Sequence, residues 1–168
     1  MSADFEAQTL LLVEDNEDDV FIFQRAYRQA QLKNPLQIVR DGEEAWDYLL
    51  GQGKFAQREK YPVPTLVFLD LKLPLKGGLE VLEEIREDPA LADLCVVVLT
   101  SSAEERDVNR ARELGARAYL VKPPPATTLL EAIAAVRARL AGVPAQEIPR
   151  ITGDLFDDSA LSRPAKTE

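Results

Sequence analysis

The sequence contains no histidine, a single cysteine and no long apolar run. The absence of histidine excludes Ser-His-Asp and Cys-His catalysis, histidine metal sites and a histidine pH switch. Cys95 is alone, so no internal disulfide can form, which fits a reducing cytoplasm. Any chemistry must therefore depend on carboxylates, lysine and hydroxyl groups, with or without a hard metal cation.

The composition also disfavours membrane and nucleic-acid surfaces. No apolar run approaches the roughly 18 to 20 residues that span a bilayer, and residues 1–8 lack the basic and apolar regions of a secretory signal. The chain has 20 basic and 29 acidic residues, a net charge of −9, whereas nucleic-acid binding needs clustered lysine and arginine. We therefore expect a cytoplasmic protein that binds neither a membrane nor nucleic acid.

Five short apolar runs alternate with stretches of helical period. The runs have the length of buried strands and lie at residues 9–13, 36–39, 66–69, 95–99 and 118–121. A helix is expected after each run, beginning with residues 18–31. Strict alternation favours right-handed crossovers and a parallel sheet. The predicted fold is α/β and flavodoxin-like, a doubly wound (βα)5 unit whose five parallel strands have the order 2-1-3-4-5.

The chain length of 168 residues allows one such domain and a short appendage. We assign the domain to residues 8–141 and expect no separate effector domain. Residues 142–168 contain three prolines and scattered apolar residues, and they are too few to bury a core of their own. Two interpretations of this segment stay open: a mobile tail, or an arm that docks on its own domain or on a second subunit.

Two connections carry local signals. Residues 51–64 contain two glycines and two prolines, which predicts an exposed loop, with a helical extension at its start left open as an alternative. Ser102, followed three residues later by Glu105, has the form of a capping box and predicts the start of the fourth helix.

Chemically distinctive side chains follow four of the expected strands. They are Glu14 and Asp15 after the first, Asp70 after the third, Thr100 and Ser101 after the fourth, and Lys122 after the fifth. Because parallel strands end at one edge of a sheet, we expect these groups to converge in a crevice. Crowded carboxylates repel one another, and a divalent cation with oxygen ligands, most naturally Mg²⁺, removes that cost. Such a group suits phosphoryl transfer to a carboxylate.

Each of these residues, taken singly, has an ordinary structural explanation. An acid after a strand commonly starts a loop or caps a helix. The acids up to Asp19 also suit the positive end of a helix dipole. The joint pattern favours function, because each residue occupies the same end of its own strand.

Several stretches form a recognisable set of motifs. They are Leu11–Asp15, Asp41-Gly42, Leu69–Pro74 with Gly78, Val98–Ser101 and Tyr119–Pro123. Over about residues 8–140, this set resembles the response-regulator receiver domain of two-component systems. The resemblance implies that Asp70 accepts a phosphoryl group from a sensor histidine kinase and that Lys122 pairs with that group. The Mg²⁺ ligands that it implies are Glu14, Asp15, Asp70 and the backbone carbonyl of Lys72.

The resemblance also implies how a signal leaves the site. Thr100 would move toward the phosphoryl oxygens and Tyr119 would turn inward behind it, which changes the face formed by the fourth helix, fifth strand and fifth helix. The Lys122-Pro123 peptide bond is expected to be cis. The residues expected to border the phosphoryl pocket are Lys72, Ser101 and Ser102. We further expect Lys72 to alter the lifetime of phosphorylated Asp70.

In its long connection at 51–64 and its lack of a fused effector domain, the chain is similar to stand-alone regulators that pair with bacteriophytochrome-type sensor kinases. That likeness implies a phytochrome-like kinase partner and a homodimer through the fourth helix, fifth strand, fifth helix and C-terminal segment. The predicted function is a phosphorelay switch, which is not an enzyme beyond its own phosphotransfer and slow autodephosphorylation. A phosphorylation-independent pseudo-receiver adaptor is the alternative. An aspartyl-phosphate phosphatase is disfavoured, because Lys72 stands where those enzymes need a second Asp.

Overall fold

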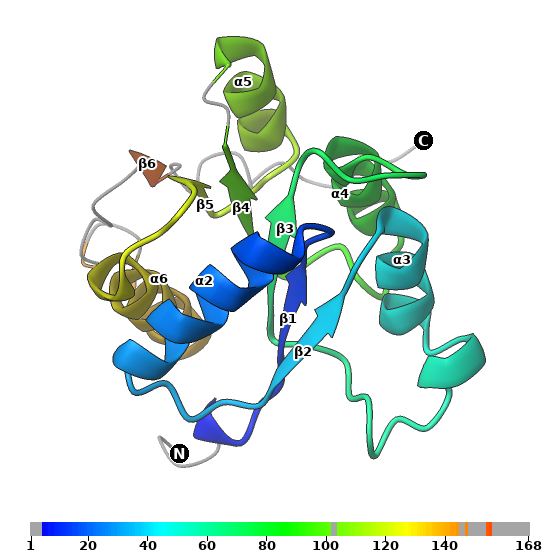
Figure 1. The fold of residues 1–168 in the computed structure, drawn as a ribbon, viewed down its shortest axis with the longest axis horizontal. Helices are drawn as coiled ribbons and strands as arrows, with labels where there is room; N and C mark the ends of the chain where they lie inside the picture. The colour runs from blue at the N-terminus through cyan, green and yellow to red at the C-terminus, as the bar shows by residue number, and fades with distance from the viewer. Residues whose placement is uncertain (1–4, 102–103, 145–146, 148–153, 156–168) are drawn as a thin grey trace.

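The computed structural model describes residues 5–101, 104–144, 147 and 154–155. Its elements, in chain order, are β1 (Leu10–Val13), α2 (Glu17–Gln29), β2 (Leu36–Val39), α3 (Gly42–Leu50), η1 (Gly53–Phe55), β3 (Leu66–Asp70), α4 (Gly78–Glu87), β4 (Cys95–Thr100), α5 (Glu105–Glu113), β5 (Ala118–Val121), α6 (Ala126–Leu140) and β6 (Asp154–Leu155). The strands form one central sheet, and the helices lie on both sides of it (Figure 1).

The first five strands are parallel and have the order β2-β1-β3-β4-β5, which confirms the predicted flavodoxin-like topology. In this register Val13 pairs with Leu69, and Asp70 pairs with Leu99. The residues that follow β1, β3, β4 and β5 therefore emerge at the same edge of the sheet.

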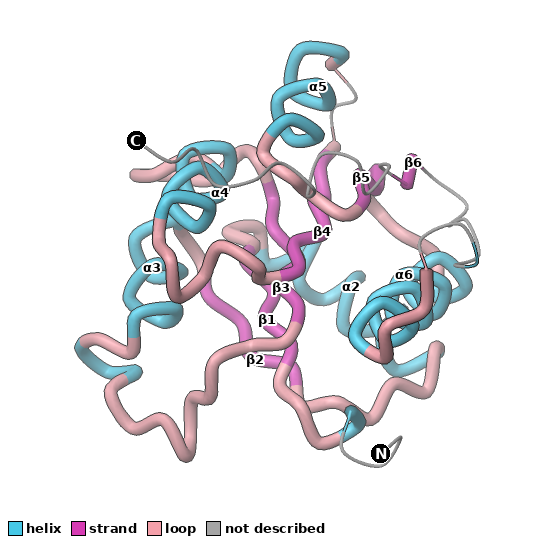
Figure 2. The backbone as a smooth tube through the Cα atoms, turned by 180° about the vertical axis from the view of Figure 1, so that it is seen from behind, coloured by secondary structure: helices cyan, strands magenta, loops and turns pink. Residues whose placement is uncertain are grey.

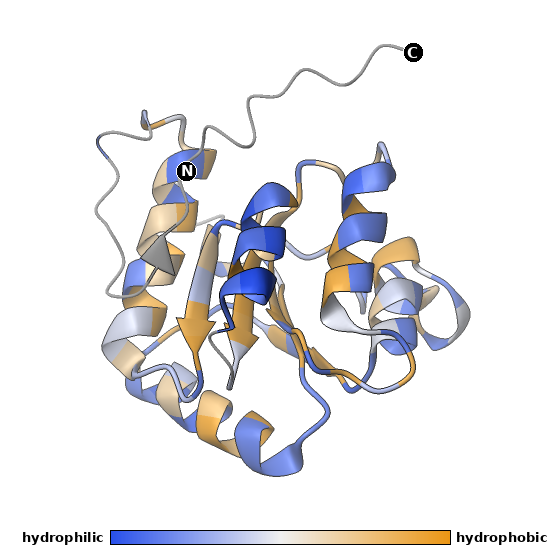
Figure 3. Ribbon diagram, turned by 90° about the horizontal axis from the view of Figure 1, so that it is seen from above, coloured by the Kyte–Doolittle hydropathy of each residue, from blue (hydrophilic) through white to orange (hydrophobic). Residues whose placement is uncertain are grey.

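Two apolar cores enclose the sheet, one on each face. Leu10 and Leu12 of β1 face α2 and α6 in the first core, whereas Leu11 and Val13 face the second core, to which α3, α4 and α5 contribute. All four side chains are at most 1% exposed, and full burial of such a side chain contributes about 1.5 to 3 kcal/mol. Figure 2 shows the two helix layers from behind, and Figure 3 shows the apolar strands between them.

Side chains set the starts of the first two long helices. The Asn16 side chain accepts a hydrogen bond from the Asp19 backbone N–H at 3.1 Å, and the Asp41 side chain accepts one from Glu44 at 2.7 Å. Each satisfies a backbone donor that has no partner within the helix. The first of these caps fixes the position of the α2 first turn beside the end of β1.

Three local features differ from expectation. Helix α2 spans Glu17–Gln29 rather than 18–31. Helix α5 begins at Glu105, after an N-cap at Glu104 whose side chain makes no capping bond, so the predicted capping-box start is wrong; Ser102 itself lies outside the described residues. The loop at 51–64 has the short helix η1 near its start, which agrees with the alternative of a helical extension, but Phe55 within it is buried rather than exposed.

A sixth strand, not predicted from the sequence, lies at the β5 edge. The backbone of β6 pairs antiparallel with β5, aligning Ala118 with Leu155 and Tyr119 with Asp154. These two residues belong to the segment for which a tail and a docked arm were both expected. Among the described residues, no helix combines the length and the apolar character that crossing a membrane requires.

Candidate functional site

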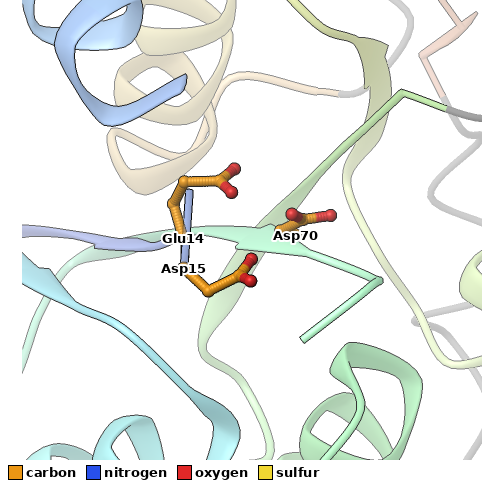
Figure 4. A group of neighbouring side chains, drawn as sticks. All are labelled: Glu14, Asp15 and Asp70. Carbon is orange, nitrogen blue, oxygen red and sulfur yellow. The ribbon is translucent and has the colours of Figure 1, made fainter. Parts of the chain in front are cut away.

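Three carboxylates meet at the edge where β1 and β3 end. Glu14 and Asp15 follow β1, and Asp70 is the last residue of β3. One oxygen from each residue lies within 4.8 Å of one from each of the others. Figure 4 shows the three side chains around a common space. Glu14 and Asp70 are buried, and Asp15 is exposed, so the group opens to solvent on one side.

Lys122 reaches the same carboxylates from the end of β5. Its Nζ donates to Glu14 Oε2 at 2.8 Å, to Asp19 Oδ2 at 2.9 Å and to Asp70 Oδ2 at 3.0 Å. Burial on its own would lower the pKa of the Lys122 ammonium group, but the three carboxylate bonds outweigh it and raise the pKa above its ordinary value. The group therefore stays charged throughout the neutral range.

Glu14 experiences opposing influences. Its burial raises its pKa, the bond from Lys122 lowers it, and the neighbouring charge of Asp70 raises it, with a net result of about 7. The other oxygen, Oε1, accepts the Asn16 backbone N–H at 3.2 Å. Removal of this carboxylate from water is thus unfavourable unless a further cation is bound nearby.

The backbone after Asp70 turns back sharply. Asp70 Oδ1 accepts the Lys72 backbone N–H at 3.1 Å, and the Gly78 N–H donates to the Leu71 carbonyl at 3.0 Å. A Cβ at Gly78 would lie 2.1 Å from the Asp70 carbonyl oxygen. The turn therefore requires glycine at this position, and the start of α4 packs directly against the residue that carries the central carboxylate.

Thr100 and Tyr119 lie together on neighbouring strands, with side chains that are buried and share a hydrogen bond. Burial raises the pKa of the Tyr119 hydroxyl, and the bond to Thr100 partly opposes that effect. The two residues connect the end of β4, beside Asp70, with β5.

The remaining residues singled out in the sequence follow the ends of β3, β4 and β5 along the chain. Lys72 and Ser101 are exposed, and Ser102 lies outside the described residues. Pro123 follows Lys122 through a cis peptide bond. The structure thus brings Glu14, Asp15, Asp70 and Lys122 into one group.

Asp19 is the residue of this group that sequence reasoning missed. It was interpreted only as part of an acidic helix start, yet its carboxylate contacts Lys122. The signal was its position: the first turn of a helix that begins directly after the Glu14-Asp15 pair lies near the same sheet edge.

The comparisons agree with this geometry. Residues 10–134 match the family model described as the response regulator receiver domain. The response regulator Rcp1 of Synechocystis sp. is 42% identical over 115 residues, which are 68% of this chain and 76% of Rcp1. A crystal structure of Rcp1 in its Mn²⁺-bound form aligns with a TM-score of 0.65 and 35% identity, covering 85% of this chain and 99% of that one.

Two further solved structures are similar. The bacteriophytochrome response regulator RtBRR is 44% identical, with a TM-score of 0.69 and 76% of each chain covered. The phosphorylated cyanobacterial phytochrome response regulator RcpA is 33% identical, with a TM-score of 0.67, and 82% of this chain and 96% of that one are covered. With its sheet order, its group of acids and lysine, and a family match over most of its length, this chain belongs to the response-regulator receiver domain family.

Proposed function

We propose that the protein is a phosphorelay switch that accepts a phosphoryl group on Asp70 from a sensor histidine kinase. The observation that carries this proposal is the 3.0 Å contact between Asp70 and Lys122, which lie 52 residues apart, within a group of three carboxylates. A nucleophilic carboxylate beside a permanently charged ammonium group is suited to attack on phosphorus.

The donor set suits Mg²⁺. Glu14, Asp15 and Asp70 offer hard oxygen ligands, and no histidine is present in the chain to favour a softer metal. The Lys72 backbone carbonyl, in the turn just after Asp70, is the proposed fourth protein ligand. When bound, Mg²⁺ would neutralise negative charge on the phosphoryl oxygens. The Mn²⁺-bound form of Rcp1 supports a divalent cation in this family.

In the proposed transfer, an oxygen of Asp70 bonds to phosphorus while the bond from phosphorus to the kinase imidazole nitrogen breaks. The electron pair of the broken bond stays on that nitrogen. Lys122 orients the phosphoryl oxygens, and the turn at Gly78 keeps the Asp70 backbone in place. The same site then slowly loses the phosphoryl group to water, for which Lys72, Ser101 and Ser102 form the proposed rim.

The proposed output is a change at the Thr100–Tyr119 pair and hence at the face formed by α5, β5 and α6. Thr100 is the last residue of β4, and Tyr119 is a buried residue of the neighbouring strand β5. A phosphoryl charge that attracts Thr100 would shift this pair between two arrangements.

The proposed partners follow from the relatives. RtBRR is described as a bacteriophytochrome response regulator and RcpA as a phytochrome response regulator. A phytochrome-like sensor kinase is therefore the proposed phosphoryl donor. A homodimer through α5, β5, α6 and the segment 142–168, outside a domain at 8–141, is the proposed assembly. Exposed Val121 and Leu140, and the backbone pairing of β6 with β5, support an interface on this face. A cytoplasmic location is also proposed, and the single cysteine of the chain, Cys95, accords with it.

Phosphotransfer from candidate kinases to the parent protein and to Asp70→Asn tests the proposal. Label is expected on the parent alone, with a change in the size-exclusion mass afterwards. Equal labelling of both proteins would assign the phosphoryl group elsewhere. No response to either a phosphodonor or beryllofluoride with Mg²⁺ would favour the pseudo-receiver adaptor.

A further inference from the structure

The ammonium group of Lys122 contacts three carboxylates, and one of them does not come from a strand end. Its Nζ lies 2.8 Å from Glu14, 2.9 Å from Asp19 and 3.0 Å from Asp70. Glu14 and Asp70 lie at the ends of β1 and β3, whereas Asp19 belongs to α2. An ammonium group has three N–H donors, so these carboxylates occupy all of them.

We propose that Asp19 is a positioning residue that holds Lys122 toward α2 and competes with a phosphoryl group on Asp70 for its ammonium group. The inference rests on the proposed function of Asp70 and adds a means by which α2 limits the affinity of the site for phosphoryl groups. A phosphoryl group extends the anionic oxygens beyond the Asp70 carboxylate. Lys122 must move to follow them, and its contact with Asp19 resists that movement.

The three contacts are not equally easy to break. The side chains of Glu14 and Asp70 are 2% and 4% exposed, whereas that of Asp19 is 35% exposed. Water can therefore solvate Asp19 after Lys122 leaves, while Glu14 would become a buried and unpaired charge. Asp19 is accordingly the contact that yields when Lys122 turns to a new anion.

The backbone keeps Asp19 in position to compete. Asn16 caps its N–H at 3.1 Å, which fixes the first turn of α2 against the end of β1. Asp19 and Lys122 also line one small cleft, together with Glu14, Pro123 and Pro124. The Asp19 carboxylate thus remains beside the path that the ammonium group would follow.

The sign of the charge gives the proposal a distinctive consequence. Three carboxylates, those of Glu14, Asp19 and Asp70, contact the Lys122 ammonium group, and the carboxylate of Asp15 lies close to those of Glu14 and Asp70. Loss of the Asp19 charge releases Lys122 for an anion and at the same time makes the site less attractive to a cation. Anion and cation affinities should therefore move in opposite directions, whereas general damage to the fold would weaken both.

The test compares the parent with Asp19→Asn, with the conservative Asp19→Glu and with the matched control Asp18→Asn, which removes the same charge from the neighbouring exposed position of α2. Mg²⁺ affinity is measured by calorimetry without any phosphodonor. Beryllofluoride affinity is measured by ¹⁹F NMR at saturating Mg²⁺.

For Asp19→Asn we expect beryllofluoride to bind about 3- to 10-fold more tightly and Mg²⁺ a few-fold more weakly, as a change of roughly one charge contact predicts. Asp19→Glu should lie near the parent, and Asp18→Asn within about twofold of it.

Each outcome decides the matter. Unchanged beryllofluoride affinity in Asp19→Asn, or weaker binding of both ligands, would overturn the role of Asp19 while leaving the proposed function of Asp70 intact. If Asp18→Asn had an equal effect on both affinities, the effect of Asp19→Asn would be a general effect of charge, and the proposed role of Asp19 would be overturned as well. A parent that binds neither Mg²⁺ nor beryllofluoride would overturn both the proposed function and this inference. Asp19→Ser, a second neutral variant, repeats the test should Asp19→Asn prove poorly folded.

Discussion

Helix α4 follows β3 and Asp70, and α5 follows β4 and Thr100, but the two helices pack against the rest of the domain to different degrees. Helix α4 buries Val81, Leu82 and Ile85, and Gly78 brings its start against the Asp70 backbone. Of the nine residues of α5, Ala111 alone is buried. In Figure 3, α5 is hydrophilic over most of its length. Buried apolar surface is the main stabilising contribution to helix packing, so the Asp70 side of the site is fixed and the Thr100 side is more easily displaced.

Hydrogen bonds from Arg86 anchor the C-terminal end of α5. Arg86 of α4 donates through Nε to the Leu114 carbonyl at 2.7 Å and through Nη2 to Gly115 at 3.0 Å. The same guanidinium donates to Ala92 and Leu94 at 2.8 Å each. A movement of α5 in response to Thr100 is therefore expected to begin at its N-terminal end and to pivot on this arginine.

The largest loss of stability is expected at Gly78, on the Asp70 side of the site. Gly78→Ala places a Cβ against backbone atoms, because 2.1 Å separates that position from the Asp70 carbonyl oxygen. We expect a loss of about 3 kcal/mol or more in the free energy of unfolding, measured by urea titration. Gly77→Ala is the control, since its nearest contact is 3.9 Å away, and it should change stability by less than about 1 kcal/mol. Similar losses in both variants would contradict a rigid turn at Gly78.

The buried Glu14 adds a pH dependence to the fixed side. Its pKa rises from 4.5 to about 7 on folding, so without Mg²⁺ the folded state retains a proton that the unfolded chain releases. Stability should therefore fall as pH rises from about 5 to about 7, by roughly 2 to 3 kcal/mol relative to Glu14→Gln. Because Mg²⁺ requires ionised Glu14, its stabilising effect should grow over the same range. Parallel pH profiles for parent and Glu14→Gln would contradict the burial argument.

Loss of the Arg86 side chain should lower stability by a smaller amount and should loosen α5 more than α4. For Arg86→Leu we expect about 2 kcal/mol less stability, since four carbonyl contacts are lost, and faster amide hydrogen exchange in α5 than in α4. The partly exposed Arg110 forms an ion pair with Glu83 at 3.5 Å, and Arg110→Leu should change stability by less than about 1 kcal/mol. Equal exchange rates in both helices of the parent would remove the contrast between them.

The smallest expected effect lies on the rim. The Lys72 side chain is exposed beside Asp70, and we expect it to steer or exclude the hydrolytic water. Lys72→Ala should change the dephosphorylation rate by a few-fold, on the order of 1 kcal/mol in barrier, without affecting stability. Identical rates for the variant and the parent would show that Lys72 has no such role.

Most of the fold and most of the site could be predicted from the sequence, because both follow from strand ends. Once five apolar runs are assigned to a parallel sheet, Glu14, Asp70, Thr100 and Lys122 must lie at one edge, whatever the details of packing. That inference needs no side-chain geometry, and it is the part that the topology confirms.

The parts that could not be predicted depend on tertiary context. Whether Asp19 faces Lys122 depends on the tilt of α2, which is set by contacts such as that of Phe23 with Phe68. The start of α5 at Glu105 departs from the Ser102 capping pattern, because a capping box is a local signal worth only about 0.5 to 2 kcal/mol. The pairing of β6 is decided by the unpaired edge of β5 rather than by any pattern in two residues.

Intact-protein mass spectrometry after incubation with a small-molecule phosphodonor tests the central claim most directly. The expected result is the gain of one phosphoryl group that depends on Mg²⁺, maps to the peptide containing Asp70 and is absent from Asp70→Asn. Modification of a different residue, or the same gain after Mg²⁺ has been chelated, would contradict the account.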